Sequence, residues 1–406
     1  MSGNKETNGA ESVPARVGIA LSGGGSRAIA FHLGCLRTLH HLGVLERARV
    51  LATVSGGSVI GAMYVAHQGT FEEFEADVRQ VLRRGFVRPA MRTALTTAEG
   101  LKAILALLVL LAAWLVGTPF RIIGALTEQF SSRPQAERKR SAPDGWLPRR
   151  FASRTTVLLR AFDSVLFHGR TLGSLRRDRP AWIAIAAELR TGAAFYFGRS
   201  DAGCWRFGTT DPSTIRLAHA VAASAAYPLL LPALDELVTF RRRDGSLVTE
   251  RIALSDGGVY DNLGLSPLWP RRDPQVGVQV EPVDTIIACR AGYGLRTIAP
   301  SLFVKARMLA AFATVHARAQ NATMTRLFDL KDAGRLQAFV LPYLDQDDRR
   351  LKYPPSDLIR REQVAGYPTN FSAMSDKWID RLSIRGEQLT LALIREHAPG
   401  LLPIAS

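Results

Sequence analysis

Residues 17–28 read Val17-Gly-Ile-Ala-Leu-Ser-Gly-Gly-Gly-Ser-Arg-Ala28, and this stretch decides the class of fold. Its first five residues form a short apolar run, which is typical of a strand buried in a parallel sheet. From Ala30 to Leu42 the apolar residues follow helical spacing, and Gly43 is a suitable helix stop. The stretch therefore predicts a strand, a glycine-rich turn and a helix.

The same order of elements recurs in the next residues. Residues 50–54 form a second apolar strand, Ser55 opens another glycine turn, and residues 59–67 form a helix. Two such units within about fifty residues predict an α/β layer architecture. Later strands are expected at residues 181–187, 193–197, 247–254 and 285–288.

Length and composition allow two or three domains, or one large α/β domain with insertions. Of the 406 residues, 47% are hydrophobic and 22% charged, which excludes a wholly disordered chain and a polytopic membrane protein. The 52 Lys and Arg residues exceed the 36 Asp and Glu residues, giving a net charge of +16. This excess predicts an anionic partner, or simply reflects a generally basic, Arg-rich composition.

Cysteine usage and the N-terminus indicate a reducing compartment. Cys35, Cys204 and Cys289 are far apart and match neither a disulfide framework nor a zinc-site spacing. Residues 1–15 are polar, so we expect a disordered N-terminus without a secretory signal.

An insertion from about residue 70 to residue 172 interrupts the α/β order. Its residues 103–120 carry no charge and just reach the length of a membrane-spanning helix, while residues 131–150 form a basic, proline-containing linker. We expect the helix to break at residues 117–119, which read Gly-Thr-Pro. Three interpretations of the apolar run remain: a single span, a re-entrant or interfacial helix, and a buried helix.

The first glycine turn, residues 22–28, predicts an anion site. Consecutive glycines between a strand and a helix let successive backbone N–H groups point into one concavity at the positive end of the helix. Such a loop binds a phosphate or a reaction oxyanion. The alternative is a purely structural turn.

The second turn places Ser55 between a strand and a helix, where a strained serine exposes its hydroxyl as a nucleophile elbow. Gly57 permits close packing of strand and helix. Thr53 occupies a position that is usually glycine, so the elbow is imperfect. The alternative is that Ser55 is an ordinary helix N-cap.

The third motif is Asp256-Gly257-Gly258, which follows an apolar strand. A carboxylate at the end of a strand can reach a serine hydroxyl and accept its proton. The alternative is an ordinary Asp-Gly turn.

Together these motifs resemble the patatin-like phospholipase family, which includes the catalytic domain of cytosolic phospholipases A2. The supporting segments are residues 22–28, 31–34, 54–58, 186–192, 223–228 and 256–258. The resemblance implies a three-layer α/β/α fold with a central, mostly parallel sheet over residues 16–300. A mostly helical extension, residues 301–406, is expected to pack on this domain.

The resemblance also implies a Ser–Asp dyad without histidine. Ser55 attacks an ester carbonyl, and Asp256 accepts its proton and later activates water. The amides of Gly24 and Gly25 bind the oxyanion, and Arg27 either binds a phospholipid phosphate or forms a structural salt bridge. No cofactor or metal is implied. The glycines that support these motifs are Gly23, Gly57, Gly257 and Gly258.

A histidine-dependent triad has less support. Only His316 and His397 follow the acid in the chain, as the usual α/β-hydrolase order requires, and neither lies in a recognisable motif.

The order of the motifs along the chain restricts how the apolar run can lie relative to a membrane. If residues 103–120 crossed a bilayer once, Ser55 and Asp256 would lie on opposite sides and no dyad could form. We therefore expect this segment to enter one leaflet or to lie at the interface, on anionic lipid at the cytoplasmic face.

The sequence thus predicts a membrane-associated serine acyl hydrolase of phospholipids or lysophospholipids. Two alternatives remain: a neutral-lipid or general esterase with the same dyad, and a lipid-binding or scaffold protein that has lost turnover. No nucleic-acid motif is recognisable, so lipid is the preferred anionic partner.

Overall fold

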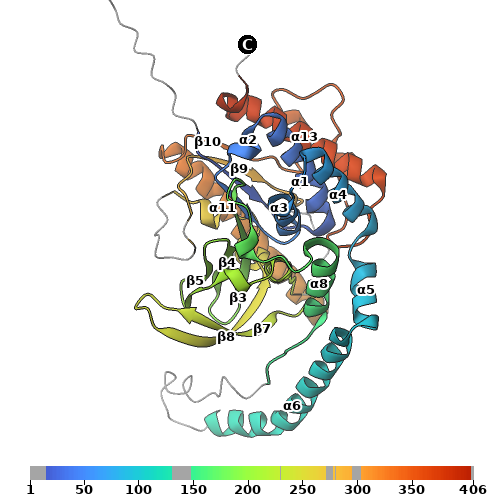
Figure 1. Cartoon of the computed structure of the whole chain (residues 1–406), viewed down its shortest axis with the longest axis vertical. Coiled ribbons are helices and arrows are strands. Elements are labelled where there is room, and N and C mark those ends of the chain that lie inside the picture. The colour runs from blue at the N-terminus through green and yellow to red at the C-terminus, as the bar shows by residue number, and fades with distance from the viewer. Residues whose placement is uncertain are drawn as a thin grey trace, which may run out of the picture.

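The computed structural model describes residues 15–129, 148–228, 230–270, 278, 280–294 and 303–403. The described chain forms a ten-stranded mixed sheet with helices on both faces (Figure 1). This confirms the predicted α/β class. The expected N-terminal disorder and most of the expected basic linker fall on residues 1–14 and 130–147, which lie outside the described ranges.

Half of the sheet is parallel. Its strands, in spatial order, are β10 (Ala338–Val340), β9 (Thr285–Cys289), β1 (Val17–Leu21), β2 (Val50–Thr53) and β3 (Ala181–Glu188). Leu21 pairs with Thr53 on one side and with Cys289 on the other, so three strands end at the same level. The turns that follow them therefore meet at one edge of the sheet.

The other half is antiparallel and returns to the first. It contains β4 (Ala193–Gly198), β5 (Ala202–Cys204), β6 (Gly208–Thr210), β7 (Leu234–Arg241) and β8 (Leu247–Asp256). Strand β8 also pairs with β3, with Ala186 opposite Asp256. This pairing brings the end of β8 beside the turns of the parallel half.

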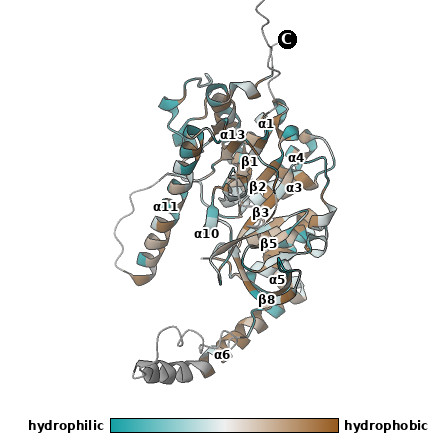
Figure 2. Cartoon of the chain, turned by 90° about the vertical axis from the view of Figure 1, so that its left-hand side faces the viewer, coloured by the Kyte–Doolittle hydropathy of each residue, from teal (hydrophilic) through white to brown (hydrophobic). Residues whose placement is uncertain are grey.

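Helices cover both faces of the parallel strands, as Figure 2 shows for α1 and α3 on one side and α11 on the other. The first face is covered by α1 (Gly25–His41), α3 (Gly56–Ala66) and α13 (Asp376–His397), and α11 (Val304–Asp332) covers the second. Side chains of β1 alternate between the faces: Ile19 and Leu21 join the first core, and Ala20 joins the second.

Helices α1 and α13 pack closely through two glycines. A Cβ atom on Gly34 would lie 1.7 Å from the Ser383 carbonyl oxygen, and one on Gly386 would lie 2.2 Å from that of Phe31. The two backbones can approach so closely only because neither position carries a side chain. Residues beyond 300 thus contribute to the main core, although the predicted division into domains stays a prediction.

The shorter helices surround this framework. They are α2 (Val44–Arg47), α4 (Phe71–Arg84), α5 (Val87–Thr96), α8 (Arg154–Phe162), α9 (Leu217–Ser224), α10 (Gly258–Asp261) and α12 (Arg361–Val364). Helix α4 begins with a capping box formed by Thr70 and Glu73. It buries Phe74 and Val78 against the core, so the insertion begins with an ordinary core helix.

Helix α6 (Ala98–Gln129) extends away from the sheet (Figure 1). Its segment Ala98–Val116 is long and apolar enough to cross a membrane by length and composition, and only 17% of it is buried. The buried-helix interpretation is therefore wrong. The expected break at residues 117–119 is also wrong, because the helix continues through Pro119. Proline removes one backbone donor, which a long helix can tolerate without ending.

Candidate active site

Ser55 lies in a strained turn between β2 and α3. Its φ of 53° and ψ of −119° fall outside the regions that residues with side chains normally adopt. Within the described ranges, His168 is the only other non-glycine residue with positive φ. Such strain persists only where the surrounding structure enforces it, and it is the geometry of a nucleophile elbow.

Two glycines allow this turn to form. A Cβ atom on Gly57 would lie 2.3 Å from the Leu21 carbonyl oxygen, so α3 starts directly against the end of β1. A Cβ atom on Gly56 would lie 2.3 Å from the Gly25 carbonyl oxygen, at the start of α1. The glycine turn after β1 and the glycine turn after β2 therefore contact each other through their backbones.

A chain of buried hydroxyl groups stabilises the elbow. The Ser55 N–H donates to Ser224 Oγ at 3.0 Å, and Ser224 Oγ lies 2.8 Å from Ser58 Oγ. Ser58 Oγ donates in turn to Thr53 Oγ1, which donates to the Ile183 carbonyl oxygen. Thr53, which departs from the usual elbow pattern, thus links the chain of hydroxyl groups beneath Ser55 to the backbone of β3.

Asp256 ends β8 with its carboxylate beside Ser55. The Ser55 side chain lies next to this carboxylate, and the Gly258 N–H donates to it at 2.7 Å. Burial raises the pKa of Asp256 to about 6, although both neighbouring groups act to lower it. The structure thus places the two side chains of the expected dyad side by side.

The backbone of Asp256 is fixed by the segment after α9. The Asp256 N–H donates to the Ala226 carbonyl oxygen at 3.0 Å, and the Gly257 N–H donates to that of Ser224 at 3.1 Å. A Cβ atom on Gly257 would lie 2.1 Å from the Ile185 carbonyl oxygen. The run at residues 223–228, expected beside the site, does lie there.

The first glycine turn lies next to the nucleophile. A Cβ atom on Gly23 would lie 3.3 Å from the Ser55 Cβ. The Gly23 N–H donates to the Asn262 carbonyl oxygen, but no acceptor in the described part of the chain binds the N–H of Gly24 or Gly25. Both glycines have positive φ, 145° and 60°. Their amides are thus available to an anion.

Sequence reasoning missed two contributors to this loop. The Gly56 N–H, directly after Ser55, also has no acceptor among the described residues, and its place in the elbow motif could have indicated it. Asn370 is the second: its carbonyl oxygen accepts the Ser26 N–H at 2.7 Å. No local signal could have predicted Asn370, because it lies far along the chain.

Arg27 supports the glycine loop from behind. Its Nε donates to the Ala291 carbonyl oxygen at 2.8 Å and its Nη1 to that of Tyr367 at 2.9 Å. The guanidinium lies over the Tyr293 ring, 4.4 Å from its centre. A Cβ atom on Gly24 would lie 3.3 Å from Arg27 Nη2, so Arg27 is adjacent to the loop.

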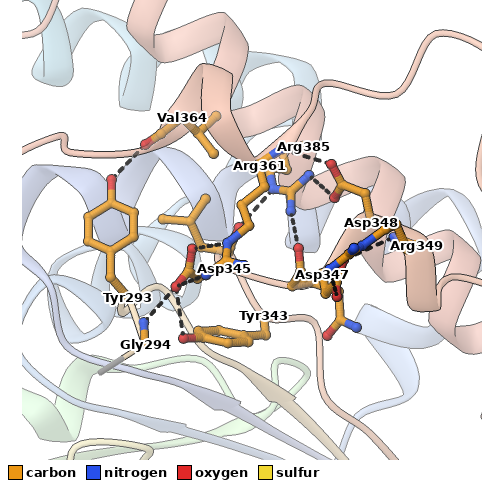
Figure 3. Close-up of polar contacts among 12 residues, drawn as sticks. Tyr293, Gly294, Tyr343, Asp345, Asp347, Asp348, Arg349, Arg361, Val364 and Arg385 are labelled. Atoms are coloured by element: carbon orange, nitrogen blue, oxygen red, sulfur yellow. Dashed lines mark hydrogen bonds and ion pairs between the residues drawn. The ribbon is translucent and has the colours of Figure 1, made fainter. Parts of the chain in front are cut away.

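A polar network fixes Tyr293 in turn (Figure 3). The Tyr293 hydroxyl donates to the Val364 carbonyl oxygen at 2.6 Å, and the next residue, Gly294, donates its N–H to Asp345. Asp345 also forms an ion pair with Arg361 at 2.6 Å. Residues in the C-terminal part of the chain thereby hold the segment around Tyr293 in place, and Arg27 contacts this segment.

The histidines expected of a triad lie elsewhere. His316 contacts the backbone of Gly258, and burial lowers its pKa. His397 ends α13 beside Glu396. In the described part of the chain neither forms a hydrogen bond with Ser55 or Asp256.

A cavity lined by described residues lies at the opposite end of the sheet. It has a volume of about 840 Å³ and is lined by Val17, Arg49, Ala181 and Thr285, at the starts of parallel strands. Ligands of open α/β sheets bind at the other ends of the strands, where Ser55 lies. Ser55 and Asp256 are only 7% and 4% exposed, so a substrate must displace neighbouring groups to reach them.

A mixed α/β sheet that presents a strained serine, a buried aspartate and open glycine amides at one edge has the architecture of an acyl hydrolase. Residues 19–269, more than half of the chain, match the family model described as patatin-like phospholipase. The chain belongs to that family, which is one of lipid acyl hydrolases.

Two solved structures match the chain at low sequence identity. Human GIVD cytosolic phospholipase A2 has a TM-score of 0.50 and 12% identity, covering 94% of this chain and 61% of that chain. VipD from Legionella pneumophila has a TM-score of 0.38 and 13% identity, covering 95% of this chain and 68% of that one. The chain thus spans about three fifths of the human protein's length. No curated protein matches it in sequence.

Proposed function

We propose that this chain is a serine acyl hydrolase that cleaves acyl esters of phospholipids or lysophospholipids at a membrane surface. The observation that carries the proposal is the placement of the buried Asp256 carboxylate next to Ser55, at a strained turn beside open glycine amides. Membership of the patatin-like phospholipase family supports a lipid ester as the substrate.

In the acylation step, Ser55 Oγ attacks the ester carbonyl carbon while Asp256 accepts the hydroxyl proton. Negative charge develops on the former carbonyl oxygen. The N–H groups of Gly24, Gly25 and Gly56 stabilise it, and removing one such donor costs about 3 kcal/mol of transition-state stabilisation. Asp256 then returns the proton to the leaving alcohol.

In the deacylation step, Asp256 accepts a proton from water, and the resulting nucleophile attacks the acyl group on Ser55. The same amides stabilise the second oxyanion, and Asp256 returns the proton to Ser55 Oγ as the fatty acid leaves. A pKa of about 6 suits this exchange, because a base that titrates near neutral pH can both accept and return a proton. No cofactor enters this mechanism.

Arg27 is proposed to position the glycine loop. Its two hydrogen bonds to carbonyl oxygens and its place against Gly24 support this role. The phosphate of a phospholipid remains an alternative ligand for it.

Helix α6 is proposed to bind the lipid surface. Its Leu101, Ile104, Leu108 and Leu115 are at least 57% exposed, and an exposed apolar surface of this kind is typical of a membrane contact. Basic residues near it, including Lys102 and the two arginines of α5, Arg88 and Arg92, favour anionic lipid.

The geometry favours an interfacial or single-leaflet position over a transmembrane span. Ser55 precedes α6 and Asp256 follows it, yet their side chains lie next to each other. One crossing would separate them. We therefore propose attachment at the cytoplasmic face, which agrees with the three free cysteines.

A fluorophosphonate probe and phospholipid vesicles test the function together. Wild type should be labelled at Ser55 and should release fatty acid, whereas Ser55→Ala should do neither. Asp256→Asn should bind vesicles and lose hydrolysis. Ser383→Ala is the matched control, because Ser383 is buried in α13 away from the site.

Three outcomes would oppose the proposal. Labelling that survives Ser55→Ala excludes Ser55 as the nucleophile. Hydrolysis of soluble esters but not of phospholipids favours a general esterase. Vesicle binding without labelling or hydrolysis in the wild type favours a lipid-binding protein that has lost turnover.

A further inference from the structure

Three potential metal ligands meet behind the glycine loop. They are His32 and Cys35 on α1 and Cys289 at the end of β9, and their ligand atoms all lie within 4.8 Å of one another. Within the described ranges this is the only group of three such residues. Each side chain is at most 1% exposed. The cysteines are far apart in the sequence, so their spacing could not have indicated the cluster.

The orientation of His32 leaves one ring nitrogen without a partner. Its Nε2–H donates to the Ser22 carbonyl oxygen at 3.0 Å, so Nδ1 carries the lone pair. No hydrogen-bond partner in the described part of the chain binds Nδ1, although His32 is fully buried. Such an orphaned acceptor is costly in a protein core. Metal-binding histidines commonly donate their second N–H to a carbonyl oxygen in this way.

We propose that His32 Nδ1, Cys35 Sγ and Cys289 Sγ form a structural zinc site. Two thiolates and a neutral imidazole are ligands that zinc favours. Their two negative charges neutralise Zn²⁺, which a buried site requires. Binding replaces the two thiol protons by the metal and releases them to solvent.

Structural zinc sites have four ligands, and the proposal assigns the fourth position to a buried hydroxyl. The hydroxyl of Thr390 on α13 lies beside Cys35 and donates to the Gly386 carbonyl oxygen at 2.7 Å. A zinc ion here would join α1, β9 and α13.

Such an ion would also fix the start of the glycine loop. His32 binds the Ser22 carbonyl oxygen, and the Cys289 carbonyl oxygen accepts the Ser22 N–H at 3.1 Å. Two of the three proposed ligand residues therefore hold Ser22, the first residue of the loop. The site is structural, since no ligand residue contacts Ser55 or Asp256 in the described part of the chain.

Zinc content tests the site without reference to activity. The full chain, produced without a histidine tag in zinc-supplemented medium, should carry about one zinc per chain, because a closed site of this kind retains its ion through purification. Cys35→Ser and Cys289→Ser should each lower the content at least tenfold. Cys204→Ser is the matched control, since Cys204 is equally buried on β5 but outside the cluster.

A second measurement covers the case in which the serine variants fail to fold. Wild type refolded with Co²⁺ in place of zinc should show the intense thiolate-to-cobalt absorption band. Less than about half a zinc per chain together with no cobalt–thiolate band overturns the proposal. Folded Cys35→Ser or Cys289→Ser with as much zinc as Cys204→Ser also overturns it, and stoichiometric copper in place of zinc overturns the choice of ion.

Discussion

Asp256 is unusual among the residues of the site because its carboxyl group is buried. In the proposed mechanism this carboxyl group must be ionised before it can accept a proton. Burial raises its pKa to about 6, and the neighbouring Ser55 side chain and Gly258 N–H only partly oppose this. A free aspartate would be ionised at all pH values above about 4. If Asp256 is the base of the proposed mechanism, its protonation should govern activity near neutral pH.

The pH dependence of the reaction follows from that pKa. Asp256 accepts a proton only when ionised, so kcat/KM should fall about tenfold per pH unit below pH ~6 and reach a plateau above it. A soluble short-chain ester is the appropriate substrate, because vesicle binding has its own pH dependence. A rate that stays constant down to about pH 5 would contradict the role of Asp256.

His316 provides the control for this profile. It lies against Gly258, and burial lowers its pKa, so it also titrates in the acid range. His316→Asn should leave the midpoint near pH 6 unchanged, since the midpoint belongs to Asp256. A midpoint that moves with this variant would assign the titration to the histidine instead.

Individual residues of the site differed in how well the sequence could predict them. Ser55 and Asp256 could be proposed from the sequence because each lies in a short motif at the end of an apolar strand. The roles of Thr53 and Ser224 could not be predicted, because their hydroxyl groups meet only after α9 packs under the elbow. Short motifs indicate which groups react, whereas distant contacts decide what supports them.

At the scale of elements, the close approach of α1 and α13 depends on the absence of a side chain at Gly34. A Cβ atom there would lie 1.7 Å from the Ser383 carbonyl oxygen, a backbone atom that cannot rotate away. Gly34→Ala should force the helices apart and lower the free energy of unfolding by about 1–3 kcal/mol.

Thermal unfolding of the variants checks this estimate. Gly400→Ala is the control, because a Cβ atom at that position meets nothing within 4 Å. Gly34→Ala should lower Tm by several degrees, and Gly400→Ala should leave it unchanged. Equal Tm values for the two variants would show that α1 and α13 are not in tight contact.

Helix α6 is the element proposed to bind the lipid surface. Ile104 and Leu108 are 60% and 57% exposed, and burying one such side chain in lipid contributes about 1.5–3 kcal/mol. The double variant Ile104→Glu, Leu108→Glu should therefore bind anionic vesicles at least about tenfold more weakly. Flotation with the vesicles measures the binding.

The same variant should hydrolyse a soluble ester at the wild-type rate, since α6 lies outside the catalytic contacts. Tyr353→Glu, at an exposed aromatic residue of the C-terminal segment, is the control for added charge. Undiminished vesicle binding by the α6 variant would exclude α6 as the lipid contact.

At the scale of the whole molecule, topology brings the site together. Strand pairing aligns the ends of β1, β2 and β9, and the return of β8 to β3 adds Asp256 to the same edge. The apolar runs and glycine turns predicted most of these strands. The pairing of β8 with β3 could not be predicted, because register across an antiparallel ladder depends on distant residues.

The same limitation applies to the cysteines. Their spacing in the sequence indicated three isolated thiols, yet the parallel pairing of β9 with β1 places Cys289 beside α1. Periodicity predicts elements, and only the assembled sheet shows which of their side chains meet. The fold could therefore be predicted from the sequence more completely than the contacts around the site.

A double-mutant cycle on kcat/KM tests whether Ser55 and Asp256 act as one catalytic unit. When one of two cooperating groups is already missing, removing the other costs little more, so Asp256→Asn should add little further loss once Ser55→Ala is present. The double variant and Ser55→Ala should therefore have the same residual rate. Losses that multiply, or an Asp256→Asn enzyme with near wild-type kcat/KM, would contradict this prediction.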